Sequence, residues 1–330
     1  MSINEAHPYD KLSPDVILDA TESAGYLCDG FLLAMNSYEN RVYQVGIHDE
    51  KPVIVKFYRP GRWSDAAILE EHEFARELDR LEIPVVAPLA DRPGETLHYF
   101  AGYRFAVFPR RSGRPPNLEN EDTLSVLGRF LGRLHACGSS RPFRHRTSID
   151  SRRLGHESRR YLLSTNFIPE FLTQRYSNIT ADLLETIDSA FAKLPHIRPI
   201  RLHGDCHPGN LLWSDRGPHI VDLDDCATGP AIQDLWMLIS GDRQSQARQL
   251  ATILEGYQQF NDFDFREITL IESLRTLRMI HHSAWLARRW NDPAFPRAFP
   301  WFDSPRYWEE QILILLEQRS LLDEPTLELY

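Results

Sequence analysis

The chain has 330 residues, of which 42% are hydrophobic and 25% charged, so it is long enough to bury a substantial core as one large domain or as two lobes. Its formal net charge of −10, with 47 acidic against 37 basic residues, opposes non-specific binding to nucleic acid or to an anionic membrane surface. Two lobes are the expected organisation.

The cysteine content and the first residues favour a cytoplasmic protein. The four cysteines form no C-x-x-C pair and are too sparse to suggest a disulfide framework, which indicates a reducing compartment. The first eleven residues lack the basic and apolar stretches of a secretory signal, and no apolar run approaches the roughly 18 residues of a membrane span. We expect no membrane or nucleic-acid partner.

Strand patterns dominate the first hundred residues. β-branched and aromatic residues concentrate at 41–45, 53–58 and 103–108. Between the last two strands, apolar residues recur over 68–78 at helical spacing, and Ser64 with Asp65 can cap the start of a helix. These patterns predict a small lobe made of an antiparallel sheet plus a helix.

A composition change marks the predicted boundary between the lobes. Residues 109–117 contain three arginines, three prolines and one glycine without any periodicity, so we divide the chain into residues 1–109 and 110–330. The second lobe is predicted to be larger and mostly helical, because apolar faces recur after the boundary, at 124–134, 253–257 and 274–284. A β-like island at 200–225 interrupts it, and the predicted class is α+β.

The island contains a cluster of polar residues typical of phosphoryl transfer. His203-Gly204-Asp205, four residues and then Asn210 match the H-x-D-x-x-x-x-N spacing of a kinase catalytic loop, and Asp222 follows at the end of an apolar strand. Such a reaction needs a carboxylate that accepts the proton of the attacking hydroxyl and oxygen ligands that hold Mg²⁺ against the phosphates. Asp205, Asn210 and Asp222 can supply these groups, although the same residue types also form ordinary turns.

A strand lysine strengthens this interpretation. Val53-Ile54-Val55-Lys56 resembles the V-A-I-K strand whose lysine contacts nucleotide phosphates, and a helix with three glutamates follows it. A lone strand lysine is usually a solvated edge residue, but here lysine, glutamate, catalytic loop and metal aspartate follow in the expected order. Glu70, Glu71 and Glu73 fall on different helix faces, so spacing does not decide which one pairs with Lys56, and we select Glu71.

Several longer stretches resemble a known family. Those at 127–135, 203–205, 221–224 and 234–236 together resemble the aminoglycoside phosphotransferase and choline kinase superfamily. More closely, Asn36–Gln44, Val55–Pro60 and Gly229–Leu238 resemble the bacterial stress response kinase A family, and the resemblance spans nearly the whole chain. It implies a two-lobed protein-kinase-like fold and a cytoplasmic, monomeric serine/threonine protein kinase of the stress response that requires ATP and Mg²⁺.

The resemblance also implies roles for individual residues. Asp205 would be the proton acceptor, and Asn210 and Asp222 would hold Mg²⁺. Ser37 would lie in the nucleotide-phosphate loop, and Lys56 would contact the α- and β-phosphates. The predicted nucleotide-binding set is completed by three further residues, which are Asn40, Glu71 and Phe108.

The chain departs from the eukaryotic kinase pattern at two places. It lacks a G-x-G-x-x-G loop, with Asn36–Arg41 in its place, and it reads Asp222-Leu223-Asp224 instead of D-F-G. Ser37, Asn40 and the amides of a tight turn are therefore expected to cradle the phosphates, because a concave run of N–H groups suffices. Regulation by phosphorylation of an activation loop is not expected.

Other polar residues admit more than one interpretation. His203, Cys206 and His207 could bind zinc, but the missing partner ligands favour a bracing role for His203. Asp224 is either a second metal ligand or a turn cap, and Asp234 is expected to support the catalytic loop. Clustered tryptophans suggest core packing over a cage for a quaternary ammonium group, and the arginines at 110–114 and 141–146 stay unassigned.

The leading functional hypothesis is a kinase that transfers the γ-phosphoryl group of ATP to Ser or Thr hydroxyls of proteins, with autophosphorylation as one outcome. The main alternative is a small-molecule kinase that acts on a metabolite or aminoglycoside hydroxyl, because the same fold serves both kinds of acceptor. A catalytically silent nucleotide-binding scaffold and a metal-dependent hydrolase are the remaining alternatives.

Overall fold

The computed structural model describes residues 7–215 and 217–329, which form two compact units. The first unit contains the chain up to Pro116 together with Phe143–Arg146 and Pro208–Cys226, and the second contains Asn117–Pro142, Thr147–His207 and the chain from Ala227 onward. The units therefore interleave along the sequence. The functional boundary between residues 109 and 110 stays a prediction.

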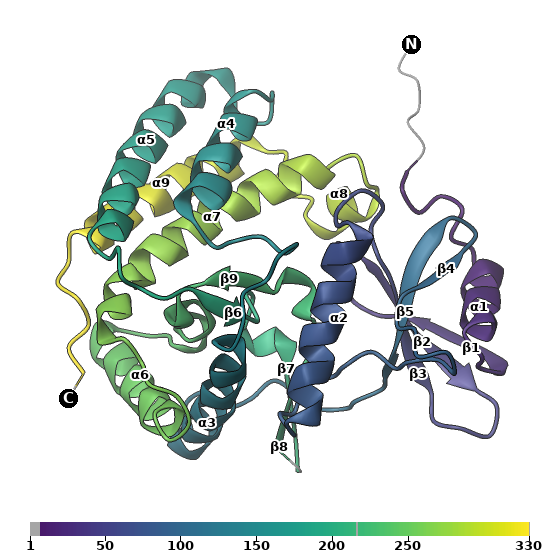
Figure 1. The fold of residues 1–330 in the computed structure, drawn as a ribbon. Helices are drawn as coiled ribbons and strands as arrows, with labels where there is room; N and C mark the ends of the chain where they lie inside the picture. Colours follow the sequence, from purple (N-terminus) through teal and green to yellow (C-terminus); the bar gives the residue numbers. More distant parts are fainter. Residues whose placement is uncertain (1–6, 216, 330) are drawn as a thin grey trace. The chain divides into compact units, whose positions relative to one another are not determined.

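The first unit is built on an antiparallel sheet of five strands in the order β1-β2-β3-β5-β4 (Figure 1). A separate hairpin of β7 and β8 belongs to the same unit. Its elements are α1 (Pro14–Ser23), β1 (Cys28–Ala34), β2 (Arg41–Ile47), β3 (Val53–Phe57), α2 (Asp65–Arg80), β4 (His98–Phe100), β5 (Tyr103–Pro109), the 3-10 turn η2 (Pro208–Asn210), β7 (Leu211–Ser214), β8 (Gly217–Ile220) and the 3-10 turn η3 (Leu223–Asp225).

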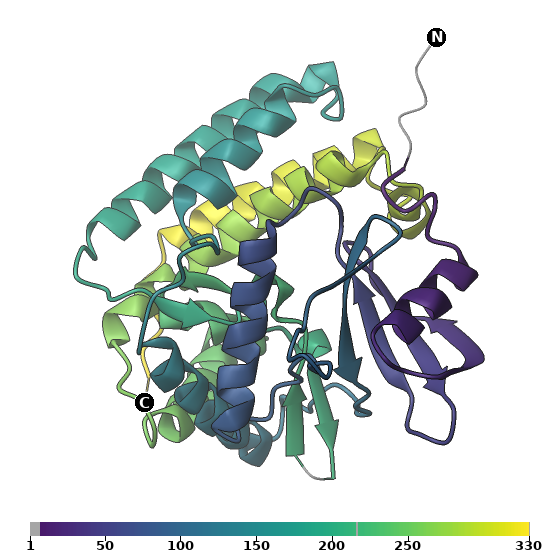
Figure 2. The same cartoon turned by 45° about the vertical axis from the view of Figure 1, so that its right-hand side comes forward.

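Alternation along β3 assigns its side chains to two faces of the sheet. Val53, Val55 and Phe57 are buried in the core that includes Ile17 of α1. Lys56 points to the opposite face, where its ammonium group approaches α2. The two helices lie on opposite faces of the sheet (Figures 1 and 2). The single lysine of this strand is thereby directed toward α2 instead of solvent.

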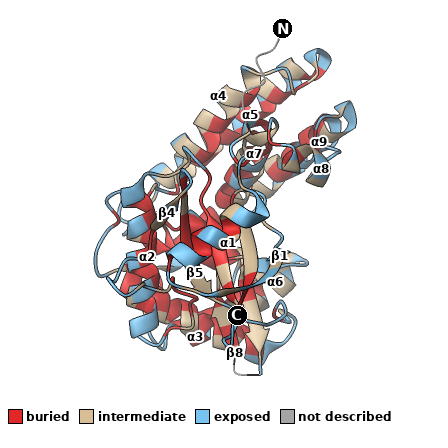
Figure 3. Cartoon of the chain, turned by 90° about the vertical axis from the view of Figure 1, so that its right-hand side faces the viewer, coloured by how far each residue is buried: buried red, intermediate tan, exposed pale blue. Residues whose placement is uncertain are grey.

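Helix α2 begins where its sequence predicts. The Ser64 hydroxyl accepts a hydrogen bond from the N–H of Ala67 at 3.2 Å, and Asp65 in the first turn and Arg80 in the last turn suit the helix dipole. Buried and exposed residues alternate along the helix (Figure 3). The predicted strands, this helix and the mostly helical remainder confirm the predicted fold class.

A buried histidine on α2 links the helix to the sheet. The Tyr58 hydroxyl lies 2.6 Å from His72 Nε2, and His72 Nδ1 lies 2.8 Å from the Thr96 hydroxyl. Burial, and secondly the Lys56 charge, lower the pKa of His72 to about 3. The imidazole is therefore neutral in the folded protein, so one of its ring nitrogens donates a hydrogen bond and the other accepts one.

His72→Gln should change how stability depends on pH. Between pH 6.5 and 3 the unfolded chain binds a proton at His72 that the folded chain does not, so stability falls as the pH falls, by roughly 2 kcal/mol between pH 7 and pH 5. Glutamine does not titrate, so the wild-type advantage should shrink by this amount. Urea unfolding at both pH values measures it, with the exposed His48→Gln as control. A pH-independent difference would refute the prediction.

The second unit is mostly helical and contains one short strand pair, β6 with β9. The predicted apolar faces at 124–134, 253–257 and 274–284 lie in α3, α6 and α7. Its elements are α3 (Glu121–Gly138), the π-helix η1 (Arg152–His156), α4 (Glu157–Leu163), α5 (Glu170–Ala192), β6 (Ile200–Leu202), β9 (Ala227–Gly229), the 3-10 turns η4 (Ala231–Asp234) and η5 (Trp236–Leu238), α6 (Arg243–Tyr257), the 3-10 helix η6 (Phe265–Leu270), α7 (Ile271–Arg289), α8 (Ala294–Ala298) and α9 (Pro305–Leu322).

Glycines explain how closely α3 packs on α6. A Cβ at Gly128 would lie 2.0 Å from the carbonyl oxygen of Ile253, and one at Gly132 would lie 2.4 Å from that of Tyr257. Any side chain at either position would force the helices apart. This contact accounts for both glycines of the 127–135 stretch and fixes the end of α3, where His135 lies.

The remaining helices of the second unit pack around α7. Helices α4 and α9 both lie against it (Figure 2). Trp308 is completely buried on α9 and meets Tyr176 of α5 edge to face, with the ring centroids 5.7 Å apart. This packing gives Trp308 a core role, as expected for the clustered tryptophans. Among the described helices, none is long and apolar enough to span a membrane.

Candidate active site

The segment that carries Asp205 is held in the second unit by a buried carboxylate. It follows β6 and turns at Gly204, whose φ of +85° favours glycine. Asp234 accepts hydrogen bonds from the N–H of His203 at 2.7 Å and from the N–H of Gly204 at 2.8 Å. Asp234 is the last residue of the 3-10 turn η4, and it makes the supporting contact expected of it.

A chain of buried groups fixes Asp234 in turn. His135 Nε2 lies 3.0 Å from Asp234, and His135 Nδ1 lies 3.0 Å from the Tyr257 hydroxyl. Burial opposes ionisation of Asp234, but the hydrogen bond from His135 leads the interactions that hold its pKa below the usual range. Asp234 is therefore charged, and a charged acceptor makes strong hydrogen bonds to the two loop amides.

Asp205 itself is partly accessible, with 23% of its side chain exposed. One carboxylate oxygen contacts the guanidinium of Arg278 on α7, and the other lies 3.5 Å from His207 Nε2. The N–H of Asp205 donates to His203 Nδ1 at 3.3 Å, which is the bracing contact predicted for His203. The Asp205 carboxylate is therefore partly exposed to solvent.

The structure gives the zinc alternative no support. Within residues 7–215 and 217–329, no group of three His, Cys, Asp or Glu side chains is placed to hold a metal ion. Cys206 is completely buried, and burial raises the pKa of its thiol well above the usual value.

The β7–β8 hairpin of the first unit brings Asn210 and Asp222 to its open end. Leu211 pairs with Ile220, and the N–H of Val221 donates to the carbonyl oxygen of Asn210 at 3.0 Å. The hairpin is attached to the segment after α2, because the N–H of Ile220 donates to the carbonyl oxygen of Pro84 at 2.7 Å. Two oxygen-bearing side chains twelve positions apart in sequence therefore flank one strand pair.

Asp222 has an unusual backbone conformation. Its φ is +61° and its ψ is +67°, the left-handed region, which costs a residue with a side chain about 1–2 kcal/mol. Aspartate tolerates this region better than most residues. Its side chain is 52% exposed, so a strained backbone conformation presents a carboxylate to solvent at this position. Such strain is concentrated at ligand-binding and catalytic positions.

Lys56 is surrounded by three carboxylates of the first unit. Its Nζ lies 3.1 Å from an oxygen of Asp222, 3.0 Å from one of Asp224 and 3.5 Å from one of Glu71. Burial alone would lower the pKa of Lys56, but Asp224, Glu71 and Asp222 raise it well above the usual value. The ammonium group is therefore charged and fixed beside the exposed Asp222.

The three glutamates of α2 have different environments. Glu71 is buried and faces Lys56, whereas Glu73 is exposed. Glu70 accepts hydrogen bonds from three consecutive backbone N–H groups of 144–146, at 2.6, 2.8 and 2.9 Å. The structure thus places at Lys56 the glutamate that the sequence analysis selected.

The predicted phosphate loop joins β1 to β2. The Ser37 hydroxyl donates to the carbonyl oxygen of Asn40 at 3.3 Å, which closes the turn. Asn40 is 3% exposed, and its side-chain oxygen accepts from the N–H of Arg59 at 3.1 Å. That oxygen therefore holds the loop on the segment that follows β3. Phe108 is partly buried and lies on the same face of the sheet as Lys56, because Ala106 is opposite Lys56 in the register.

The sequence left the role of Asp224 open. It is 2% exposed, and its two oxygens contact Lys56 and Arg62. Although burial opposes ionisation, Arg62 and Lys56 lower the pKa of Asp224. Both oxygens are engaged by cations, so Asp224 here orients Lys56. Arg62 lies in a polar loop, and no sequence pattern marked it.

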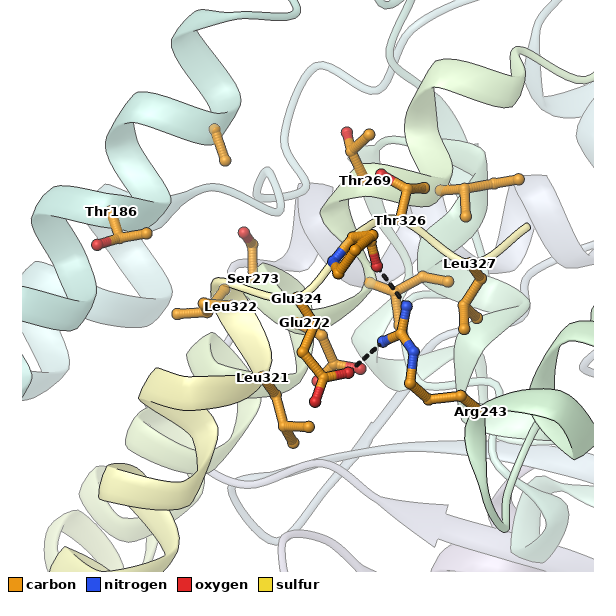
Figure 4. A pocket seen from close by; sticks show the side chains of 14 residues that line it. Thr186, Arg243, Thr269, Glu272, Ser273, Leu321, Leu322, Glu324, Thr326 and Leu327 are labelled. Carbon is orange, nitrogen blue, oxygen red and sulfur yellow. Dashed lines mark hydrogen bonds and ion pairs between the residues drawn. The ribbon is translucent and has the colours of Figure 1, made fainter.

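The cavity in Figure 4 is separate from these residues. It has a volume of about 80 Å³ and lies within the second unit, between α5, α7 and the segment after α9. Arg243 holds that segment through Glu324, at 2.7 Å, and through the carbonyl oxygen of Pro325. None of the predicted site residues lines this cavity, so its size and position suit a packing defect beside the terminal segment better than a substrate site.

Comparison with known proteins identifies the family. Residues 33–270 match the phosphotransferase enzyme family. The chain belongs to this family. It is 45% identical over 326 residues to stress response kinase A of Escherichia coli O157:H7, covering 99% of this chain and 98% of that protein. The same identity and coverage apply to the serine/threonine protein kinase RdoA of Salmonella typhimurium, strain LT2. The predicted resemblance is therefore confirmed.

Two solved structures of the same fold are named as kinases of small molecules. An amicoumacin kinase in complex with AMP-PNP, Ca²⁺ and amicoumacin superposes with a TM-score of 0.69 at 19% identity, covering 93% of each chain. A microcompartment-associated aminopropanol kinase gives 0.69 at 18% identity, covering 94% of this chain and 97% of that one. At this identity the likeness establishes the fold alone.

Proposed function

We propose that the protein is an ATP- and magnesium-dependent serine/threonine protein kinase. The observation that carries the proposal is the buried Lys56, charged and held by Glu71 and Asp224 beside the strained, exposed Asp222. A fixed cation suits the phosphates of a nucleoside triphosphate, and an exposed carboxylate beside it suits the metal ion that accompanies them. Relatives named as stress response kinase and serine/threonine protein kinase support the choice of a protein acceptor and a role in the stress response.

The proposed roles follow from the chemistry of the residues. Asp205 accepts the proton of the acceptor hydroxyl, and Asn210 and Asp222 hold Mg²⁺, which neutralises charge on the phosphates when it is bound. Lys56 contacts the α- and β-phosphates. Ser37 and Asn40 shape the phosphate loop, Glu71 orients Lys56, and Phe108 offers an apolar surface to the nucleotide; these make up the proposed nucleotide set.

The oxygen donors fit magnesium better than softer metals. Asn210 and Asp222 supply an amide and a carboxylate oxygen, which are the ligands that Mg²⁺ prefers, and the phosphates and water complete its coordination. The exposed carboxylate of Asp222 is available for this, whereas buried Asp224 is already paired with two cations. We also propose that the enzyme is cytoplasmic and monomeric.

A small-molecule kinase is the second candidate function, and the names of the structural neighbours favour it. The residues proposed for phosphoryl transfer are the same in both cases, because the acceptor type is set elsewhere in the fold. The two candidates therefore differ in the acceptor and not in the chemistry.

Phosphate transfer from labelled ATP tests the proposal. The purified protein is incubated with γ-labelled ATP and Mg²⁺, first alone, then with a generic basic protein, then with a pool of sugars, amino alcohols and aminoglycosides. Label on Ser or Thr of the protein itself or of the added protein is the expected result. Label entering small molecules alone would establish the second candidate, and tight ATP binding without any transfer would contradict both.

A further inference from the structure

A short segment between α3 and η1 is fastened to α2. Residues 143–146 belong to the first unit, although the chain on either side of them belongs to the second. Phe143 packs edge to face on Phe74 of α2, with ring centroids 5.3 Å apart. The three N–H groups of 144–146 bind the Glu70 carboxylate. Charge-assisted bonds to three consecutive amides fix the backbone position of this segment.

This anchorage directs Arg146 into the interior of the first unit. Its side chain is completely buried, and its guanidinium carbon lies 4.0 Å from the centre of the Trp63 ring. Nε donates to the carbonyl oxygen of Cys226 at 2.9 Å, and one terminal nitrogen donates to the carbonyl oxygen of Asp224. The other terminal nitrogen lies 3.7 Å from Glu71. Arg146, which the sequence analysis left unassigned, is therefore a buried residue with several partners.

These contacts connect the two groups of residues that hold Lys56. Glu71 comes from α2, and Asp222 and Asp224 come from the loop after β8. Arg146 makes a longer ionic contact with the Glu71 carboxylate, without a hydrogen bond, and donates hydrogen bonds to two backbone oxygens of the loop. Because a guanidinium is planar and its donors have fixed directions, one side chain sets the spacing between helix and loop. A lysine would keep the charge but could not make these directed contacts together.

We propose that Arg146 is a positioning residue for the magnesium nucleotide. It holds the loop of residues 222–226 against Glu71, so that Asp222 and Lys56 keep the spacing that the metal ion and phosphates require. This inference rests on the proposed function, because it assigns Arg146 a task in that same site. Arg146 does not touch the reacting atoms.

Arg146→Lys tests the inference, with Arg144→Lys as the matched control. Arg144 is in the same segment and its side chain is exposed. We expect Arg146→Lys to raise the KM for MgATP and the Mg²⁺ concentration for half-maximal activity by about tenfold, as for residues that orient metal ligands. The KM for the protein acceptor and all constants of Arg144→Lys should match the wild type. Wild-type magnesium and MgATP dependence in Arg146→Lys would overturn the inference, even if its melting temperature fell.

A second variant covers the case in which Arg146→Lys does not fold. Glu70→Gln leaves Arg146 in place but weakens the anchor of its segment, so it should shift the magnesium requirement in the same direction and by less. An unchanged requirement there would also overturn the inference. The two proposals fail in different experiments. Absence of phosphate transfer by the wild type in the labelled-ATP assay would refute the kinase. Calorimetric titration with ATP, with Mg²⁺ and then with EDTA, measures binding, and equal MgATP binding by wild type and variants would refute the role of Arg146.

Discussion

Asp205→Asn should retain ATP binding and lose at least about 10²-fold in the rate of phosphoryl transfer, because an amide cannot accept the proton of the attacking hydroxyl. The replacement has nearly the same shape. It gives up a partly exposed ion pair with Arg278, which is worth no more than about 1 kcal/mol. Single-turnover transfer from γ-labelled ATP measures the rate, and calorimetry measures ATP binding.

Asp303→Asn is the matched control for this variant. Asp303 is exposed and belongs to the same unit, so its change removes a carboxylate without touching the loop of residues 203–207. It should transfer phosphate like the wild type. Unchanged transfer in Asp205→Asn would refute its assignment as the base, and a loss of ATP binding would assign Asp205 to the nucleotide instead.

Asp222→Ala should weaken ATP binding at least about tenfold, or about 1.4 kcal/mol, when Mg²⁺ is present. The change removes a carboxylate ligand of the metal ion. In EDTA the loss should vanish or reverse, because the carboxylate beside Lys56 otherwise repels the phosphates. Titrations of ATP with and without Mg²⁺ measure both affinities.

Two controls separate metal binding from backbone strain. Asp222→Asn keeps a residue that tolerates the left-handed conformation at φ +61°, so its loss of affinity reports the charge. Asp215→Ala removes an exposed carboxylate near the tip of the same hairpin and should behave as the wild type. Equal losses with and without Mg²⁺ in Asp222→Ala would show that Asp222 does not act through the metal ion.

Local patterns were enough to predict strands β2, β3 and β5 of the first unit and helix α2. Strand β3 is rich in β-branched residues, and α2 has both helical periodicity and a serine cap, so neighbouring residues suffice to specify them. The edge strand β1 is largely exposed and has no clear alternation, and no prediction covered it. Helix α5, with 23 residues, was not predicted as a separate element, although its buried residues Leu172, Tyr176, Ile179, Leu183 and Ile187 recur at helical spacing.

The candidate site was predicted as a list of residues but not as a set of contacts. Asp205, Asn210 and Asp222 could be predicted because they lie within one stretch of chain, at the spacing of a kinase catalytic loop and its metal-binding aspartate. The choice among the glutamates of α2 could not be made in this way, since adjacent helical positions differ by about 100° and either face can turn inward. Packing directs Glu71 to Lys56 and Glu70 to the backbone of residues 144–146.

The sequence by itself determined the fold class, the family and the order of the chemical groups along the chain, because periodicity and motif spacing are local properties. The tertiary structure alone decided which buried partners hold those groups in place. His135 supports Asp234 from 99 positions away, and Arg146 reaches the carbonyl oxygen of Cys226 from 80 positions away. Such pairs form when separate helices and loops pack together and every buried donor needs an acceptor, which no local pattern records.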